Sequence, residues 1–355
     1  SKMLLKKEEV VKVFQNINET EKTKEEIGNK KYILANVISK KYIILYIVTL
    51  MVSMVNMGYG VSPFSLAIIA ASVATEIPVI AVVVVGLIGN AVKLGVSGSI
   101  NFIITLLIFF ASFFVKEPKY NDTSRNEKVM LSKRIFFASL IVNVIKIFMT
   151  QFLTYDLLVA ISMSIVVTIF YKIFANSLSV ITNYNDKMAF SIEEVLGTSL
   201  LLSIALCSLG DFSILGFSVR NVLSIFIVLV LGWKNGILIG TTAGATIGVT
   251  LGIIANNEPI VVAAYAISGM IAGILNRFGK IGVICGFVLG NIVLSYVANG
   301  MVQNLILFKE ILIAGIALLA VPKNINLNIE NVVGNDKFLP VGTNRGLNRS
   351  KETVN

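Results

Sequence analysis

The chain has 355 residues, of which 55% are hydrophobic and only 14% are charged, and its mean hydropathy is +0.84. Soluble domains carry about 25% charged residues, so most of this chain has too little polar surface to face water. The apolar residues form blocks of roughly 15–20, which is about the length of a helix that crosses a bilayer. The composition excludes an ordinary soluble protein and predicts an all-α, polytopic integral membrane protein.

The net charge of +10 does not indicate a nucleic-acid partner. The Lys and Arg residues lie in tails and in loops that border the apolar blocks, where they set topology and contact anionic headgroups. The chain has no histidine, and Cys207 and Cys285 fall in separate apolar blocks without a CxxC neighbour. We therefore expect the lipid bilayer as a partner, and no metal site, disulfide framework or cofactor in this chain.

Residues 1–41 form a polar tail with ten Lys and six Glu. Met3, Val10, Phe14 and Ile17 share one face if this tail is helical. The pattern leaves open a helix on the membrane surface and a short solvated helix within a flexible tail.

Twelve apolar segments follow the tail. They cover residues 42–57, 64–75, 77–92, 99–115, 134–151, 157–174, 193–209, 219–231, 235–254, 259–275, 281–297 and 305–321. The second segment is short and is followed by Pro78, so residues 64–92 form either two spans or a re-entrant hairpin. The sequence predicts a helical bundle of about 10–12 membrane segments over residues 42–321.

The distribution of basic residues tests this count. If the 1–41 tail is cytoplasmic and the segments alternate, the basic loop 116–134 also lies inside, as do most other loop lysines and arginines. Arg220 and Lys309 are the exceptions near outer ends. This asymmetry predicts that both termini are cytoplasmic. The polar stretch 322–355 reads as the start of a cytoplasmic linker to a domain absent from this chain.

Glycines recur at a strict spacing of four in three apolar segments. They are Gly232, Gly236, Gly240, Gly244, Gly248 and Gly252, then Gly269 and Gly273, then Gly282, Gly286 and Gly290. Such ridges allow close helix packing in lipid, and neighbouring residues such as Thr246 and Thr250 are candidates for interhelical hydrogen bonds. The pattern leaves open packing within the chain, self-association of chains and a glycine-lined conduit. It is not a nucleotide-binding loop, because GxxxxGK[ST] is absent.

Ionisable residues in the apolar segments lie near segment ends. Asp211 and Arg220 flank one outer loop and are candidates for an ion pair, and Lys309 and Glu310 begin the last segment, where a Glu suits the helix dipole. No segment carries a mid-bilayer carboxylate of the kind that ion-coupled transporters use. The five Asp residues are scattered over different loops, so we expect no catalytic site in this chain.

Several stretches carry a family resemblance. They are Ser-Pro-Phe-Ser-Leu-Ala at 62–67, the run from 209–213 through 231–236 and the glycine ridge, and the motifs at 277–280, 296–300, 321–323 and 338–340. They resemble the membrane region of the stage II sporulation protein E family. This chain has Ser65 at the position where that family usually has Gly. The resemblance is specific over about residues 190–345 and weaker over 42–115.

The resemblance implies a membrane region that precedes a regulatory segment and a metal-dependent Ser/Thr phosphatase of the PP2C type. In that family the phosphatase, which uses manganese or magnesium, acts on an anti-anti-sigma factor and so activates the first forespore sigma factor. The family protein gathers at the polar sporulation septum and engages the tubulin-like cell-division protein. For this chain the resemblance implies anchoring in the bacterial cell membrane, septal localisation and a homo-oligomer, without the catalytic aspartates.

The alternative function is that of a small-molecule membrane transporter or channel. It predicts internal repeats with broken helices around a polar site at the membrane midplane. The short pair 64–92 is its best support, but the other half of the sequence shows no second copy of that pair.

Overall fold

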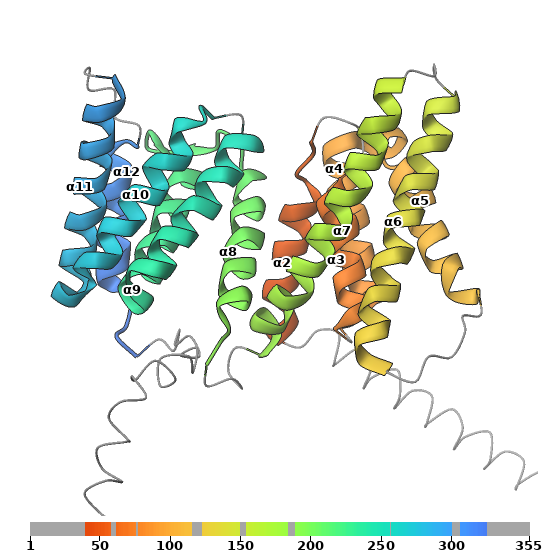
Figure 1. Cartoon of the computed structure of the whole chain (residues 1–355), viewed down its shortest axis with the longest axis horizontal. Helices are drawn as coiled ribbons and strands as arrows, with labels where there is room; N and C mark the ends of the chain where they lie inside the picture. The colour runs from red at the N-terminus through yellow and green to blue at the C-terminus, as the bar shows by residue number, and fades with distance from the viewer. Residues whose placement is uncertain are drawn as a thin grey trace, which may run out of the picture.

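A computed structural model describes residues 40–57, 62–75, 77–115, 123–149, 154–183, 189–255, 257–299 and 306–324 (Figure 1). These residues are almost entirely helical, which confirms the predicted all-α class. Residues 1–39 and 325–355, which make up nearly all of the predicted tail and most of the predicted linker, lie outside the described residues.

The helices follow the predicted apolar segments. They are α2 (Lys40–Ser53), α3 (Pro63–Ala74), α4 (Val79–Gly98), α5 (Ile100–Ala111) with the 3-10 turn η1 (Ser112–Phe114), α6 (Thr123–Met149), α7 (Thr154–Asn183), α8 (Ile192–Cys207), α9 (Val219–Ile253), α10 (Ile260–Ile274) with η2 (Leu275–Phe278), α11 (Gly279–Asn299) and α12 (Phe308–Ala320). Strands β1 (Ser213–Ile214) and β2 (Phe217–Ser218) form a small hairpin before α9.

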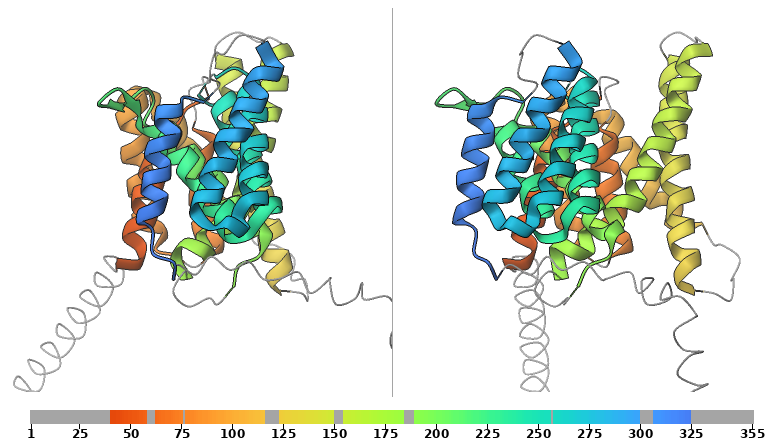
Figure 2. Two further views of the ribbon diagram at one scale, coloured as in Figure 1. Left: turned by 90° about the vertical axis from the view of Figure 1, so that its left-hand side faces the viewer. Right: turned by 60° about the vertical axis from the view of Figure 1, so that its left-hand side comes forward.

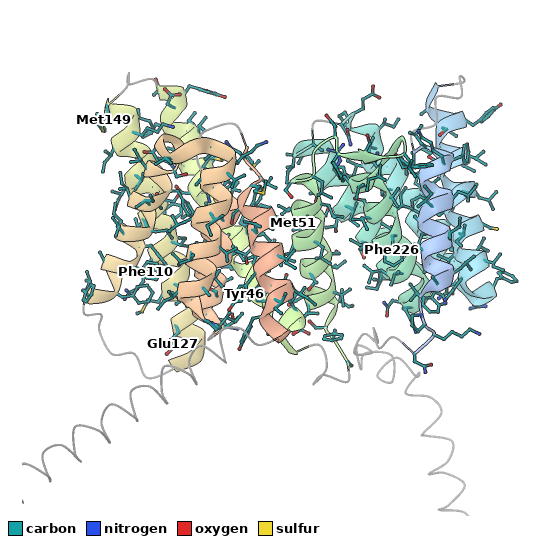
Figure 3. The ribbon with its side chains drawn as sticks, turned by 180° about the vertical axis from the view of Figure 1, so that it is seen from behind. Tyr46, Met51, Phe110, Glu127, Met149 and Phe226 are labelled. Atoms are coloured by element: carbon teal, nitrogen blue, oxygen red, sulfur yellow. The ribbon has the colours of Figure 1, made fainter. Side chains whose placement is uncertain are left out.

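Four helical stretches among the described residues are long and apolar enough to cross a membrane. They cover Val79–Val96, Thr154–Thr182, Val219–Ile253 and Ile260–Ala298, and shorter apolar helices accompany them. The predicted loop 116–134 is only partly a loop, because α6 begins at Thr123 and carries four of its basic residues, Arg125, Lys128, Lys133 and Arg134. Figure 3 shows Glu127 and Met149 at opposite ends of α6, so this helix crosses the full height of the bundle. The predicted apolar segment 134–151 had covered only the apolar part of α6.

The long helix α9 is a hairpin that reverses at Gly236. Along a straight helix, Gly232 and Gly240 would be about 12 Å apart. Instead, an ideal Cβ built on Gly232 would lie 3.7 Å from the Cα of Gly240. Gly236 itself has φ 76° and ψ −156°. The predicted segments 219–231 and 235–254 are therefore two antiparallel arms, which we call the first and second arms of α9.

The same backbone conformation recurs at two other helix junctions. Gly279, between η2 and α11, has φ 72° and ψ −157°, and Gly95 in α4 has φ 72° and ψ 175°. This region of backbone space is essentially open to glycine alone. At Gly279 the chain folds back, so that α10 and α11 form a second helical hairpin in which Gly286 faces Ala272.

The helices form two groups that meet at α8. One apolar core is built from α2 to α8 and a second from α9 to α12, and Cys207 at the end of α8 packs against both. Figure 1 shows α8 between the two groups, and Figures 1 and 2 show α2 beginning and α12 ending at the same face of the bundle. Many Ile, Leu and Val side chains on the outer faces are exposed, as expected for surfaces that contact lipid.

Helix α3 lies inside the first group rather than at its surface. Its residues from Pro63 to Ser72 are all buried, and its 12 residues span only about 18 Å, which is too short to cross a bilayer core. Ser65 links three helices, because its hydroxyl lies 3.0 Å from the Ser53 hydroxyl on α2 and accepts from the Asn90 side-chain amide on α4 at 3.0 Å. Residues 64–92 thus form a short interior helix followed by a long one.

The β1–β2 hairpin has an unusual residue at its turn. Ile214 pairs with Phe217, and the two residues between them, Leu215 and Gly216, have φ values of 52° and 78°. Two positive φ values indicate a type I′ turn, which normally takes Asn-Gly or Gly-Gly. Left-handed backbone costs a residue such as Leu about 1–2 kcal/mol. Leu215 is also 91% exposed, so packing within the chain does not offset this cost.

We predict that Gly279→Ala lowers the free energy of unfolding by about 1–3 kcal/mol, the usual cost of a forced backbone conformation. Nothing lies within 4 Å of an ideal Cβ at this position, so the loss isolates the backbone effect from any clash. The measurement is an SDS-unfolding titration of the purified protein, with the exposed Ile281→Ala as control. Equal stability of the two variants would contradict the assigned backbone conformation.

Candidate functional site: the glycine-packed helices and their two ends

The second arm of α9 and helix α10 approach to backbone contact along the glycine ridge. An ideal Cβ on Gly240 would lie 2.5 Å from the Gly269 carbonyl oxygen, and one on Gly273 would lie 2.6 Å from the Gly236 carbonyl carbon. Of the remaining ridge glycines, Gly232 faces Gly240 and Gly273, Gly244 faces the Tyr265 backbone, and Gly248 and Gly252 face Val262. The Gly252 contact, at 3.5 Å to a side-chain methyl, and the Gly232 contacts, at 3.7 Å or more, would leave room for a Cβ.

The third ridge packs against another part of α10. Gly282 faces the Leu275 carbonyl and Phe278, Gly286 faces Ile271 and Ala272, and Gly290 would place a Cβ 2.5 Å from the Ser268 Cα. Helix α10 therefore lies between two glycine-lined helices of the same chain. These contacts place the glycines of all three ridges against parts of the same chain, and association of two chains stays a prediction.

The threonines of the second arm do not link helices. The hydroxyls of Thr246 and Thr250 each donate to the carbonyl four residues earlier on the same helix, at 2.7 and 2.8 Å. The expectation of interhelical hydrogen bonds from these residues is wrong, because the local carbonyl is always within reach of a helical threonine. Backbone proximity rather than side-chain hydrogen bonding characterises this interface.

At one end of the bundle, Glu310 joins α12 to the start of α9. Glu310 is 2% exposed, and its carboxylate accepts from the Ser218 backbone N–H at 3.3 Å and from the Asn221 side-chain amide at 3.2 Å. Ser218 is the N-cap of α9. The sequence correctly placed Glu310 in the first turn of the last helix. It gave no sign of this contact, since the partners lie 89 and 92 residues away.

Three other side chains, those of Asp211, Arg220 and Asn291, make contacts near this end. Asp211 and Arg220 are 3.9 Å apart, but the Asp211 side chain is fully exposed, so their pairing contributes little to stability. Asn291 on α11 is completely buried; its amide donates to the Ile306 carbonyl at 2.8 Å and accepts from the Ile306 N–H at 3.2 Å. This pair of hydrogen bonds fixes the chain just before α12. Asn291 was not identified from the sequence, because a single Asn in an apolar segment is not a recognisable motif.

At the opposite end, two lysines hold the end of α12. Lys280 donates to the Leu319 carbonyl at 3.0 Å and to that of Val321, and Lys234 donates to the Lys323 carbonyl at 2.7 Å. Both ammonium groups also lie over the Trp233 ring, 4.4 Å away for Lys234 and 5.0 Å for Lys280. We call this arrangement the lysine collar.

Of the three carbonyls that the collar binds, that of Leu319 lies in the last turn of α12, while those of Val321 and Lys323 follow the end of the helix. The last carbonyls of a helix have no partner within it and carry partial negative charge, so cations bind there favourably. Lys234 comes from the reversal of α9 and Lys280 from the reversal before α11. Both glycine reversals therefore contribute to fixing the direction in which the chain leaves α12.

The SpoIIE N-terminal domain family model matches residues 2–330 of this chain. The chain belongs to the SpoIIE N-terminal domain family. It is also 26% identical over 182 residues to stage II sporulation protein E of Bacillus subtilis (strain 168), which covers 51% of this chain. The chain spans about a fifth, 22%, of that relative's length. No solved structure matches.

The family match covers every element of this site in the SpoIIE N-terminal domain, including the glycine ridges, Glu310 and the lysine collar. Within the described residues there is no group of three side chains that could hold a metal ion. The contacts described above are those of close helix packing and of helix ends held by side chains.

We predict that Gly240→Ala lowers the free energy of unfolding by about 1–3 kcal/mol through overpacking, because the added methyl meets backbone that cannot move without separating α9 from α10. Gly252→Ala, three turns along the same ridge, is the matched control and should be nearly neutral. SDS-unfolding titrations of both variants make the measurement. A ridge that tolerated both substitutions equally would exclude the close approach.

We predict that Lys280→Gln loosens the end of α12 and shifts the emission of Trp233 to longer wavelength, because water reaches the indole when the collar opens. The chain contains a single Trp, so the fluorescence reports this site alone. Arg277→Gln is the control, since Arg277 is exposed and lies outside the collar. An unchanged emission maximum in Lys280→Gln, or the same shift in both variants, would contradict the role of Lys280.

Proposed function

We propose that this domain is the membrane anchor of a sporulation-specific Ser/Thr protein phosphatase and carries that enzyme to the polar septum. The family match is the observation that supports this function most directly. The apolar helices supply the means of anchoring. The phosphatase activity and the activation of the first forespore sigma factor belong, in this proposal, to the longer protein.

The arrangement of the chain's described ends supports an anchoring role. Helix α2 begins and helix α12 ends at the same face of the bundle (Figure 2). We propose that this side is cytoplasmic, in agreement with the basic residues of the collar. A helix end held by two lysines would orient a following domain rather than merely tether it.

We propose further that the domain forms a homo-oligomer and that the assembled protein engages the tubulin-like cell-division protein. The glycine ridges are occupied within the chain, so self-association would use other surfaces. The outer faces of α4, α5 and α6 offer many exposed apolar side chains for that contact.

The proposal predicts that residues 1–355 fused to a fluorescent protein concentrate at the polar septum of sporulating cells without any phosphatase domain. A fusion with Glu310→Ala, which removes the contact between α12 and the start of α9, should still reach the membrane because the substitution makes α12 more apolar. It should lose septal enrichment if the fold is what localises the domain. Uniform membrane fluorescence of the unmodified fusion in sporulating cells would contradict septal targeting by this domain.

One observation favours the alternative of a small-molecule transporter. Asn90 and Thr49 are buried beside the interior helix α3, and the Asn90 Oδ1 and Thr49 Oγ1 atoms have no hydrogen-bond partner among the described residues. Short interior helices with polar neighbours occur at transporter substrate sites. Solute uptake by proteoliposomes that is lost in Asn90→Leu would support this alternative. Proteoliposomes that take up no solute would support the membrane anchor instead.

A further inference from the structure

The β1–β2 hairpin presents an apolar tip that no other part of the described chain covers. Residues 212–218 read Phe-Ser-Ile-Leu-Gly-Phe-Ser, and Phe212, Ile214 and Leu215 are all exposed. The outermost residue, Leu215, adopts a left-handed conformation that Leu disfavours and that Asn or Gly would adopt readily. A residue that is unfavourable both in conformation and in water indicates a selected apolar contact beyond the chain.

The hairpin is held in place from its base. Lys309 donates to the Gly216 carbonyl at 2.7 Å and lies 5.5 Å from the centre of the Phe217 ring. Its neighbour Glu310 accepts from the Ser218 N–H, and the Val219 N–H donates to the Phe212 carbonyl at 3.2 Å. These contacts fix the base of the turn and leave the side chains of its tip exposed.

The position of the hairpin defines what it meets. Figure 2 shows it at the face of the bundle opposite to the one where α2 begins and α12 ends, extending sideways from the helices rather than along their axes. It leads directly into the apolar first arm of α9 at Val219. Asp211, just before it, is fully exposed and marks the water side. The hairpin therefore lies at the boundary between water and lipid.

We propose that the 212–218 hairpin is an interfacial anchor whose tip, Leu215 with Ile214 and Phe212, inserts into the bilayer leaflet on that face. No charged residue lies between Asp211 and Arg220 in the sequence, which matches this environment. Asp211 is exposed on the water side, Arg220 is buried within the bundle, and the exposed Lys309 ammonium at the Gly216 carbonyl lies at the headgroup level. Insertion beside the bundle resists rotation and tilting of α9 and α12 in the membrane. The inference does not depend on the proposed phosphatase.

The test places a fluorescent probe next to the tip. The full chain, with Cys207→Ala, Cys285→Ala and Ser213→Cys, is labelled with an environment-sensitive nitrobenzoxadiazole group and reconstituted into phosphatidylethanolamine–phosphatidylglycerol vesicles. The expected result is blue-shifted emission, strong quenching by nitroxide-labelled phosphatidylcholine and weak quenching by aqueous iodide. The matched control, Asp211→Cys, should show the opposite preference.

A second variant separates lipid contact from folding. Leu215→Asn suits the left-handed turn better than Leu and should preserve the hairpin. We expect it to reduce lipid quenching of the probe at position 213 several-fold while leaving the circular dichroism and unfolding midpoint unchanged or slightly improved. Unaltered lipid quenching in Leu215→Asn would overturn the role of the apolar tip.

Two other outcomes overturn the proposal outright. Quenching by iodide with no lipid quenching in the unmodified hairpin would place the tip in water. Protection from both quenchers, together with disulfide-linked dimers of unlabelled Ser213→Cys under oxidation, would assign the tip to a contact with a second copy of the chain.

Discussion

Helix α10 is clamped between two glycine-lined helices at backbone contact, and much of the second half of the molecule depends on this close packing. In lipid, the burial of apolar side chains contributes little to helix association, so close van der Waals contact must stabilise the packed helices. The ridge of α9 and the ridge of α11 supply that contact on two sides of α10. A Cβ at most of these positions would separate the helices by the thickness of a methyl group, and the geometry at both ends would be lost with them.

Both ends of the clamp are closed by charged side chains that reach across long sequence separations. Glu310 ties the beginning of α12 to the N-cap of α9, while Lys234 and Lys280 hold its end. The two lysines are brought to that end by the glycine reversals at Gly236 and Gly279. Packing and capping are therefore coupled, because the turns that bring glycine ridges together also deliver the collar. In the proposed function, this coupling gives a following domain a defined orientation.

The first group of helices is packed around a buried helix rather than along glycine ridges. Its centre is the short, fully buried α3, which crosses no membrane and is surrounded by longer helices. The hydroxyl of Ser65 connects α2, α3 and α4 through Ser53 and Asn90. Hydropathy alone could not distinguish such an interior helix from a span, because a segment buried in protein and a segment buried in lipid are equally apolar.

The amino-acid sequence by itself determined the helical class, the membrane environment, the positions of nearly all helices and the family. Each of these depends on local hydrophobicity or on short motifs, which can be recognised without knowing which helices are neighbours in the fold. The reversal at Gly236 separates the two segments 219–231 and 235–254, as the interruption around Lys234 had indicated. Only the tertiary structure decided that the ridges face α10, that the threonines bond to their own helix, and that Glu310, Asn291 and the lysine collar hold the helix ends. These depend on which helices become neighbours, and that choice is made by complementary backbone surfaces far apart in the chain.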